Sequence, residues 1–562
     1  MKNIWFFSIV LLFLVSSCQE KKSSNNLTAA KPEFVDLIIK NAKIYSVDSG
    51  FTKAEAIAIK KGEIVFIGST VEVEKQYKSI NVEDLNGAFV YPGFADPHCH
   101  FLGYARTLLN VDLVGTASQE DVIEKASDFF GENPEGWVQG RGWDQNDWAE
   151  SGWDVSQFPS KEALDKAFPN NPVAFRRVDG HALWVNSKAL KMAEIRAALK
   201  IEGGEVVVDE NGEPTGVLLD NAADLVLNII PENIKGRDAE AIQRAQQNCF
   251  AVGLTFLHDA GLPLNDVLFL KEQYEQEKLK MRIYQMISHE EETVDYFEAN
   301  GPINTDRFWV RSIKCYMDGA LGSRGAWLKK PYHDAGGQIG LQVTQNDAMR
   351  LLLQRALRMK FQVNTHAIGD MAVKNTLNLY SEVLDGNTNI KWRIEHSQVV
   401  DVEDLAMYAK YSIIPSIQAT HATSDMYWAD ERLGDRIETA YAYQDLLKTN
   451  GWILNGSDFP VENINPLYGF YAAVARMDQE GYPEGGFQME NALTREQALR
   501  AMTIWAAKGA FLESELGSLE LGKKADFVIL EKDLMTAPIN ELYKLKVLRT
   551  YINGEQVYKA NS

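Results

Sequence analysis

The sequence predicts an α/β protein built on a (β/α)8 TIM barrel. A small β-sandwich formed from both chain termini and an insertion capping the barrel mouth complete the expected fold. Three observations support this fold class. Between residues 88 and 510, apolar runs that end in polar residues alternate with amphipathic helical patterns. Short strand-like runs recur at both chain ends, and one segment of the barrel region is too long for a single loop. Repeated βα units imply a parallel sheet, and about eight of them imply a closed barrel.

The first 18 residues resemble a bacterial lipoprotein signal peptide. Lys2 gives a short positive region, and residues 6–15 are an apolar run too short to span a bilayer as an ordinary helix. Small residues then precede Cys18 in "LVSSC", which resembles a lipobox; a plain secretory signal is the alternative. Residues 19–34 are polar and aperiodic, as expected of a flexible tether. We therefore expect export to the bacterial cell envelope, facing the periplasm or the surface, with a lipid anchor at Cys18 as the only membrane contact.

Both ends of the chain predict strands. Residues 35–87 and 511–562 hold alternating or apolar runs broken by Gly and Asn. A few strands at each end cannot bury a face alone, so we expect the two ends to meet in one composite β-sandwich. Residues 88–510 would then form the barrel domain, with the insertion at about 105–235.

Composition narrows the class of protein. The 562 residues are 45% hydrophobic and 24% charged, which is ordinary for a globular protein. A net charge of -21 without a basic stripe argues against a nucleic-acid partner, because phosphate binding requires a basic surface. Cys99, Cys249 and Cys315 form no CxxC pair, so we expect buried, inert thiols rather than a disulfide framework or a zinc ribbon.

Four histidines and one aspartate stand where predicted strands end. "DPHCH" places His98 and His100 two positions apart, so both side chains point to the same face of a strand. His366 closes "FQVNTH", His396 closes "WRIEH", and Asp458 follows "WILNGS". The carboxyl ends of barrel strands build the active site, and neutral imidazoles are good ligands for Zn²⁺. A lone HxH is a weak signal, but four of the nine histidines at such positions predict a metal site.

The chain from about Val35 to Tyr558 resembles the amidohydrolase superfamily, amidohydrolase family 3 in particular. "RVDGHALWVNSKAL", "IKCYMDGALGSRGA" and "HAIGDMAV" are similar to the branch that contains N-substituted formamide deformylase. The resemblance implies one or two divalent metal ions, with zinc expected, and it is compatible with a homodimer, since dimers are common among relatives. The implied metal ligands are His98, His100, Lys314, His366, His396 and Asp458.

Lys314 is a ligand only through this resemblance. A protonated lysine repels a cation, so binding requires that CO2 carbamylate the neutral amine. Burial beside a cation favours the neutral amine by lowering the lysine pKa from its usual ~10.4. The carbamate would then bridge two metal ions. An ordinary salt-bridged lysine near a mononuclear site is the alternative.

The implied reaction is hydrolysis of a non-peptide carbon–nitrogen bond by a metal-activated water. The substrate would be a small-molecule amide or N-substituted formamide. A divalent metal lowers the pKa of its water towards ~7, and Asp458 is the candidate to accept that proton and pass it to the leaving nitrogen. The first alternative is a carbamate, cyclic amide or ester hydrolase that uses the same site. The second is a catalytically inactive envelope lipoprotein that binds a small molecule.

Candidate substrate contacts in the insertion come from two short segments. His181 and Asn186 resemble a family motif that faces the substrate, with a helix-capping role as the alternative. Trp143 and Asp144 would line the cap, where an aromatic wall favours an apolar or aryl N-substituent. The alternative is that the tryptophans are the core of the insertion.

Three more candidates lie in the barrel region. His258 ends "GLTFLH" and would hold a carbonyl oxygen at the mouth, or form a structural hydrogen bond to Asp259. Asp318 and Arg324 lie in a Gly-rich loop after Lys314. They would orient the lysine or the substrate, or form an ion pair within the loop.

Overall fold

The structure is a computed structural model that describes most of the chain. Within the described part, no helix is both long and apolar enough to cross a bilayer. The expected signal peptide, Cys18 and most of the tether lie outside the described residues. The described residues are 31–131, 134–154, 157–177, 182–196, 199, 204–220, 222–230, 235–322, 324–387 and 389–561.

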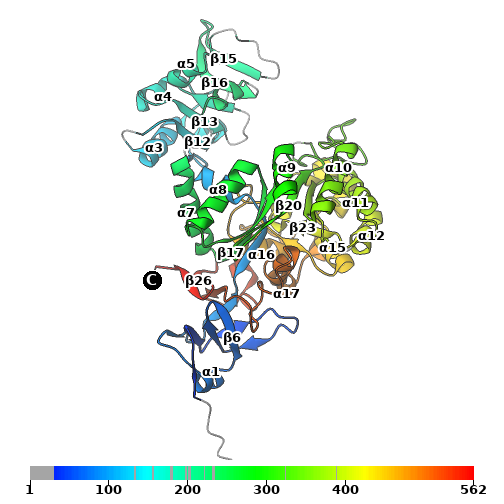
Figure 1. Cartoon of the computed structure of the whole chain (residues 1–562). Helices are drawn as coiled ribbons and strands as arrows, with labels where there is room; N and C mark the ends of the chain where they lie inside the picture. The colour runs from blue at the N-terminus through cyan, green and yellow to red at the C-terminus, as the bar shows by residue number, and fades with distance from the viewer. Residues whose placement is uncertain are drawn as a thin grey trace, which may run out of the picture.

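Eight parallel strands make a nearly closed barrel at the centre of the molecule (Figure 1), which confirms the predicted fold class. A short strand, β19 (Ile303–Asn304), pairs antiparallel with β20 outside this path. In hydrogen-bonded order the barrel strands are β10 (Phe94–Cys99), β17 (Leu254–Leu262), β18 (Arg282–Ile287), β20 (Phe308–Tyr316), β21 (Gln362–Ala367), β22 (Arg393–His396), β23 (Ile414–Ile417) and β24 (Leu454–Asn455).

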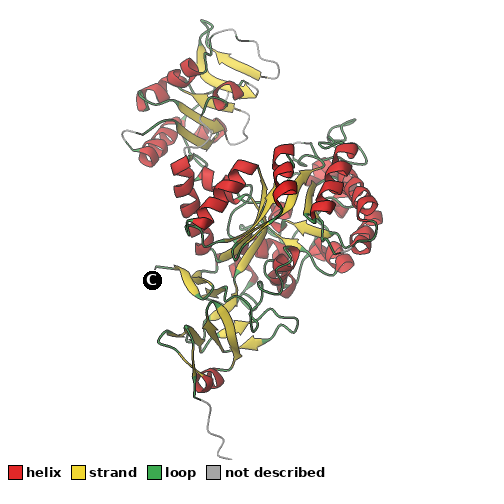
Figure 2. Cartoon of the chain, in the orientation of Figure 1, coloured by secondary structure: helices red, strands yellow, loops and turns green. Residues whose placement is uncertain are grey.

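Helices surround the barrel strands (Figure 2). Each presents an apolar face to the strands; α10, for example, buries Met349, Leu353 and Ala356 at helical spacing. The main helices are α7 (Lys235–Ala251), α8 (Leu264–Glu275), α9 (Glu291–Asn300), α10 (Asn346–Met359), α11 (Asp370–Leu384), α12 (Val402–Tyr411), α15 (Tyr443–Asn450), α16 (Pro466–Ala475), α17 (Arg495–Ala501) and α18 (Ile504–Gly509).

The barrel closes through the segments that follow its first and last strands. The amide of Asp458, just after β24, donates to the carbonyl of His98 in β10 at 2.7 Å. The amide of His100 donates in return to the carbonyl of Phe459 at 2.8 Å. Two of the predicted ligand segments therefore meet at the closure of the barrel.

The two chain ends build paired sheets below the barrel. The first sheet contains β2 (Leu37–Lys40), β5 (Ala56–Lys60), β6 (Glu63–Gly68) and β8 (Val82–Asp84). The second contains β3 (Lys43–Tyr45), β4 (Lys53–Ala54), β9 (Phe89–Pro92), β25 (Phe527–Leu530), β26 (Val547–Ile552) and β27 (Glu555–Lys559). β25 pairs antiparallel with β9, and one apolar core joins residues of both sheets, Ile39 and Phe527 among them.

The insertion folds as a lobe with its own sheet and cores. Its strands are β11 (Val111–Asp112), β12 (Val138–Trp143), β13 (Val173–Arg177), β14 (Ala182–Val185), β15 (Gly204–Val208) and β16 (Pro214–Asp220). Its helices are α3 (Gln119–Phe130), α4 (Lys161–Ala167), α5 (Ser187–Met192) and α6 (Asp224–Leu227). The lobe was expected to cap the mouth, but here it stands clear of the barrel, beside α7 and α8 (Figure 1). Its large aromatic side chains are buried against one another instead of against the barrel.

Candidate metal centre

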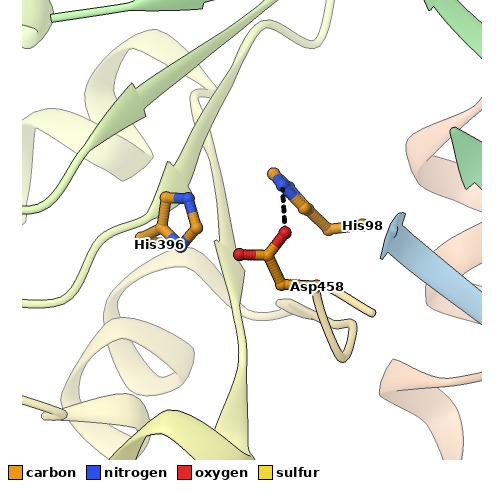
Figure 3. Close-up of side chains that lie close together, drawn as sticks. All are labelled: His98, His396 and Asp458. Carbon is orange, nitrogen blue, oxygen red and sulfur yellow. Dashed lines mark ion pairs between the residues drawn. The ribbon is translucent and has the colours of Figure 1, made fainter. Parts of the chain in front are cut away.

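The predicted ligands converge at the carboxyl ends of the barrel strands. One nitrogen or oxygen atom from each of His98, His396 and Asp458 lies within 4.8 Å of the others (Figure 3). His100 joins them, with its Nε2 at 3.1 Å from Oδ1 of Asp458. The ring of His366 lies 4.4 Å from that of His396, centroid to centroid.

Lys314 completes this group from β20. Its Nζ lies 3.0 Å from Nε2 of His98, and its side chain is buried. The structure thus brings together all six residues that the family resemblance implied as ligands.

Unusual backbone conformations orient two of the predicted ligands towards the site. His396 has a φ of 74° and Asp458 a φ of 63°, both in the left-handed region that non-glycine residues rarely adopt. Such strain persists where the surrounding structure holds it, commonly at functional sites. Gly456 is required nearby, because a Cβ there would lie 2.7 Å from the amide nitrogen of His98.

A buried aspartate fastens the first and last ligand segments together. The carboxylate of Asp96 accepts from the amide of His98 at 3.1 Å and from Oγ of Ser457 at 2.6 Å. It also accepts from the amide of Ser457 at 3.1 Å. Asp96 therefore holds His98 and Asp458 in register across the closure of the barrel.

Hydrogen bonds fix which ring nitrogen of His98 and of His100 faces the cluster. Nδ1 of His98 lies 2.6 Å from Oε2 of Glu395, and Nδ1 of His100 lies 3.0 Å from the carbonyl oxygen of Ala260. Because a carboxylate and a carbonyl only accept, Nδ1 carries the proton in both rings. The lone pair of each Nε2 therefore points towards Asp458.

Burial sets the protonation states that metal binding requires. It lowers the pKa of His98 and His396, and it lowers the pKa of His366 to about 3, with the Lys314 charge adding to the effect. It also lowers the pKa of Lys314. Burial alone would raise the pKa of Asp458, but the surrounding histidines hold it well below its usual range. The site therefore favours neutral imidazoles and an ionised carboxylate.

The cluster fits a divalent cation. In the described part of the chain, Oδ1 of Asp458 and Nδ1 of His396 are buried without a hydrogen-bond partner. A buried polar atom left unsatisfied costs about 1–3 kcal/mol, so such atoms call for a partner of another kind. Imidazole nitrogens and a carboxylate oxygen are the donor set that Zn²⁺ and related ions accept.

The predicted substrate contacts of the insertion that the structure describes lie within the lobe. Trp143 is fully buried in the core of the lobe, and Asp144 forms an ion pair with Arg177 at 2.5 Å. Asn186 caps α5, with its side-chain oxygen accepting from the amide of Ala189. His181 lies outside the described residues. The structure places none of the three described residues in the metal cluster.

The predicted contacts of the barrel region have structural partners. Nδ1 of His258 is bonded to Arg393 at 3.0 Å, not to Asp259, and the ring is fully buried. The carboxylate of Asp318 accepts from three backbone amides, those of Trp327, Ile368 and Gly369.

Arg324 forms an ion pair with Asp334 and not with Asp318. Its guanidinium lies 2.7 Å from the carboxylate of Asp334, at an exposed position. Asp318, by contrast, lies beside the metal cluster, 3.7 Å from Nε2 of His366. The two loop residues therefore do not pair with each other.

Sequence reasoning missed His421. This residue lies in α13 (Ala419–Asp425), which follows β23. Its ring stacks on that of His396, with the ring centroids 5.8 Å apart and an angle of 13° between the ring planes. Its Nε2 is buried and lies 4.0 Å from Oδ2 of Asp458. The available signal was a histidine four residues beyond the end of β23.

A cavity of about 800 Å³ opens beside the cluster. His100, whose side chain is 32% exposed, lies on its wall together with Tyr316. Pockets of 300–1,000 Å³ suit small molecules. The metal cluster is therefore accessible from a space that would admit a small substrate.

Comparisons with known proteins agree with this geometry. The model of a family described as "Amidohydrolase family" matches residues 81–558. The chain is 32% identical over 526 residues to "Putative amidohydrolase YtcJ" of Bacillus subtilis, covering 92% of this chain and 98% of that protein. It is 26% identical over 550 residues to the N-substituted formamide deformylase of Arthrobacter pascens, covering 93% of this chain and 98% of that protein. A solved metal-dependent hydrolase from Pyrococcus furiosus superposes with a TM-score of 0.75 at 26% identity, covering 89% of this chain and 100% of that one.

Proposed function

Since the chain belongs to the amidohydrolase family, we propose that it hydrolyses the carbon–nitrogen bond of a small-molecule amide or N-substituted formamide. The observation that carries this proposal is the buried His98–His396–Asp458 cluster with its partnerless atoms. His100, which lies 3.1 Å from Asp458, connects this cluster to the wall of a cavity of about 800 Å³. Similarity over nearly the whole chain to a protein named N-substituted formamide deformylase supports the bond type.

The proposed mechanism needs metal ligands and a proton carrier, and Asp458 serves as both. His98, His100, His366, His396 and Asp458 would hold one or two divalent ions, for which we propose zinc. Such an ion supplies Lewis acidity, which polarises a carbonyl and lowers the pKa of water towards ~7. The Asp458 carboxylate accepts the proton of the attacking water and passes it to the leaving nitrogen. His100 faces the cavity, so a substrate carbonyl reaches the cluster from that side.

A panel of compounds tests the bond type. N-formyl, N-acetyl and N-aryl amides are assayed for amine release, beside carbamates, cyclic amides and esters of matched size. We expect the amides or formamides to have the highest kcat/KM. Faster cleavage of esters or carbamates would reject the proposed bond while keeping the hydrolase. A purified protein that binds no metal after loading with zinc or manganese would favour a small-molecule-binding protein instead.

Lys314→Ala is expected to change the metal content. We propose that CO2 carbamylates Lys314 and that the carbamate would help to hold a second ion, because the buried amine lies 3.0 Å from Nε2 of His98, a proposed ligand atom. Elemental analysis after loading in bicarbonate should give about two metal ions per wild-type chain and about one in the variant, as binuclear sites require. Lys374→Ala, at a half-buried position of α11 outside the cluster, is the matched control. One ion in both proteins would remove Lys314 from the centre.

The cavity wall predicts discrimination by substrate charge. The positive charge of Arg106 on this wall is neutralised by Asp266 at 2.7 Å and by Asp238 at 3.1 Å. The charge of the wall is therefore set by two carboxylates, those of Glu290 and Glu292. We therefore expect substrates with a carboxylate to react more slowly than their neutral isosteres.

Neutralising this wall should relieve the discrimination. In the double variant Glu290→Gln/Glu292→Gln, kcat/KM for the anionic substrate should rise about 2- to 5-fold relative to the neutral one, the range expected for exposed charges. High salt should shrink the difference. Glu291→Gln, on the same helical turn but outside the cavity wall, is the matched control. If the ratio of kcat/KM for the anionic and neutral substrates is unchanged in the double variant, the wall does not discriminate substrates by charge.

A further inference from the structure

A buried carboxylate contacts His98 on the side of the ring that faces away from Asp458. Glu395 precedes His396 in β22, and its side chain is completely buried, as is that of His98. Its Oε2 lies 2.6 Å from Nδ1 of His98. Neighbouring residues of a regular strand point to opposite faces, but the positive φ of His396 interrupts this alternation. Both residues at the end of β22 therefore reach His98.

We propose that Glu395 is a positioning residue of the metal centre. Its carboxylate accepts a hydrogen bond from the Nδ1–H of His98, fixes the rotation and tautomer of the ring, and so directs the Nε2 lone pair towards the place where an ion would bind. Carboxylates that hold the second nitrogen of a ligating histidine commonly tune metal affinity. Without Glu395, the proton of His98 is free to sit on Nε2, where it blocks ligation. The proposal concerns metal binding and is independent of which bond the enzyme cleaves.

The charge of Glu395 is balanced by a buried arginine. Nη1 of Arg393 lies 3.9 Å from Oε1 of Glu395, and both side chains are completely buried. Oε1 itself has no hydrogen-bond partner in the described chain. A buried charge is tolerated only with compensating charge nearby, which Arg393 on one side and a bound cation on the other would provide.

Other contacts hold Arg393 in place beneath the site. Its guanidinium donates to the carbonyls of Gly509 at 2.7 Å and Pro97 at 3.3 Å, and to Nδ1 of His258 at 3.0 Å. This gives His258, expected at the mouth, a role as an acceptor for the arginine. The chain thus builds a layer of support below the ligands, from His258 through Arg393 and Glu395 to His98.

Metal affinity tests the proposal independently of catalysis. The Kd for Zn²⁺ is measured by competition with a chromogenic chelator, using the stripped full-length protein and its Glu395→Gln variant. We expect the variant Kd to rise about 10- to 100-fold, the usual effect of losing such a partner. Glu403→Gln, at an exposed position of the following helix α12, is the matched control and should bind like the wild type.

A purely structural role makes the opposite prediction. It would lower the melting temperature of the stripped variant and leave the Kd unchanged, and that result would overturn the proposal. Glu395→Asp keeps the charge but withdraws it by one methylene, so its Kd should lie between those of the wild type and Glu395→Gln. It also serves as the test if Glu395→Gln does not fold. A wild type that binds no zinc would refute the metal centre itself, whereas equal binding by wild type and variant would refute the role of Glu395 alone.

Discussion

Asp458→Asn is expected to reduce kcat by about 10³-fold, within the range that a positioned acid–base group contributes. Asparagine keeps the shape of the side chain but cannot accept a proton from water. KM should change little, because Asp458 lies with the cluster and not among the residues that line the cavity. Steady-state kinetics of amine release, at matched metal content, provide the measurement.

The control for this variant is an aspartate near the same strand. Asp445→Asn changes an exposed residue of α15, the helix that precedes β24, and should have wild-type kinetics. Turnover by Asp458→Asn close to that of the control would mean that another group accepts the proton. His421, at 4.0 Å from Asp458, would then be the next residue to test.

Removing the metal is expected to abolish hydrolysis and to lower the melting temperature. The ion would bind the assembled cluster of the native chain, so it stabilises that state by about 2.7 kcal/mol when its concentration is 100 times its Kd. Without it, the buried atoms of Asp458 and His396 have no partner. Calorimetry and amine release are measured after chelation and dialysis, and again after zinc is restored.

Recovery separates metal loss from damage to the protein. Zinc should restore both the activity and the melting temperature, whereas Mg²⁺, which prefers oxygen ligands, should restore little. In the variant His396→Ala, zinc should restore less of either quantity, because one nitrogen ligand is gone. Full activity in a protein from which elemental analysis detects no metal would refute the proposed mechanism.

The sequence predicted which side chains gather at the barrel mouth because their positions obey simple rules. Strand alternation places His98 and His100 on one face, and the carboxyl ends of barrel strands share one edge. Lys314 required the family resemblance, because nothing in its local sequence separates a ligand from an ordinary lysine.

Residues that act through three-dimensional contacts escaped prediction. Glu395 was visible in "WRIEH" only as the residue before a ligand, and its partner lies 297 positions away. Asp96 likewise acts on Ser457 across 361 positions. Such contacts depend on tertiary geometry that local patterns do not encode.

The insertion shows a different limit. Its tryptophans predicted an ordered unit, and the structure buries Trp143 and Trp148 in the lobe. Composition could not say whether those rings face one another or a substrate.

The place where the barrel closes has a consequence for how the chain avoids aggregation. No strand ladder of the described chain joins β24 back to β10, so the gap is bridged by the hydrogen bonds of His98, His100 and Asp458. A sheet that stays open there presents two edges with unpaired backbone groups, which invite pairing with other chains. An ion held by those same residues would link the two edges of the open sheet. Loss of the ion should then favour aggregation as well as abolish hydrolysis.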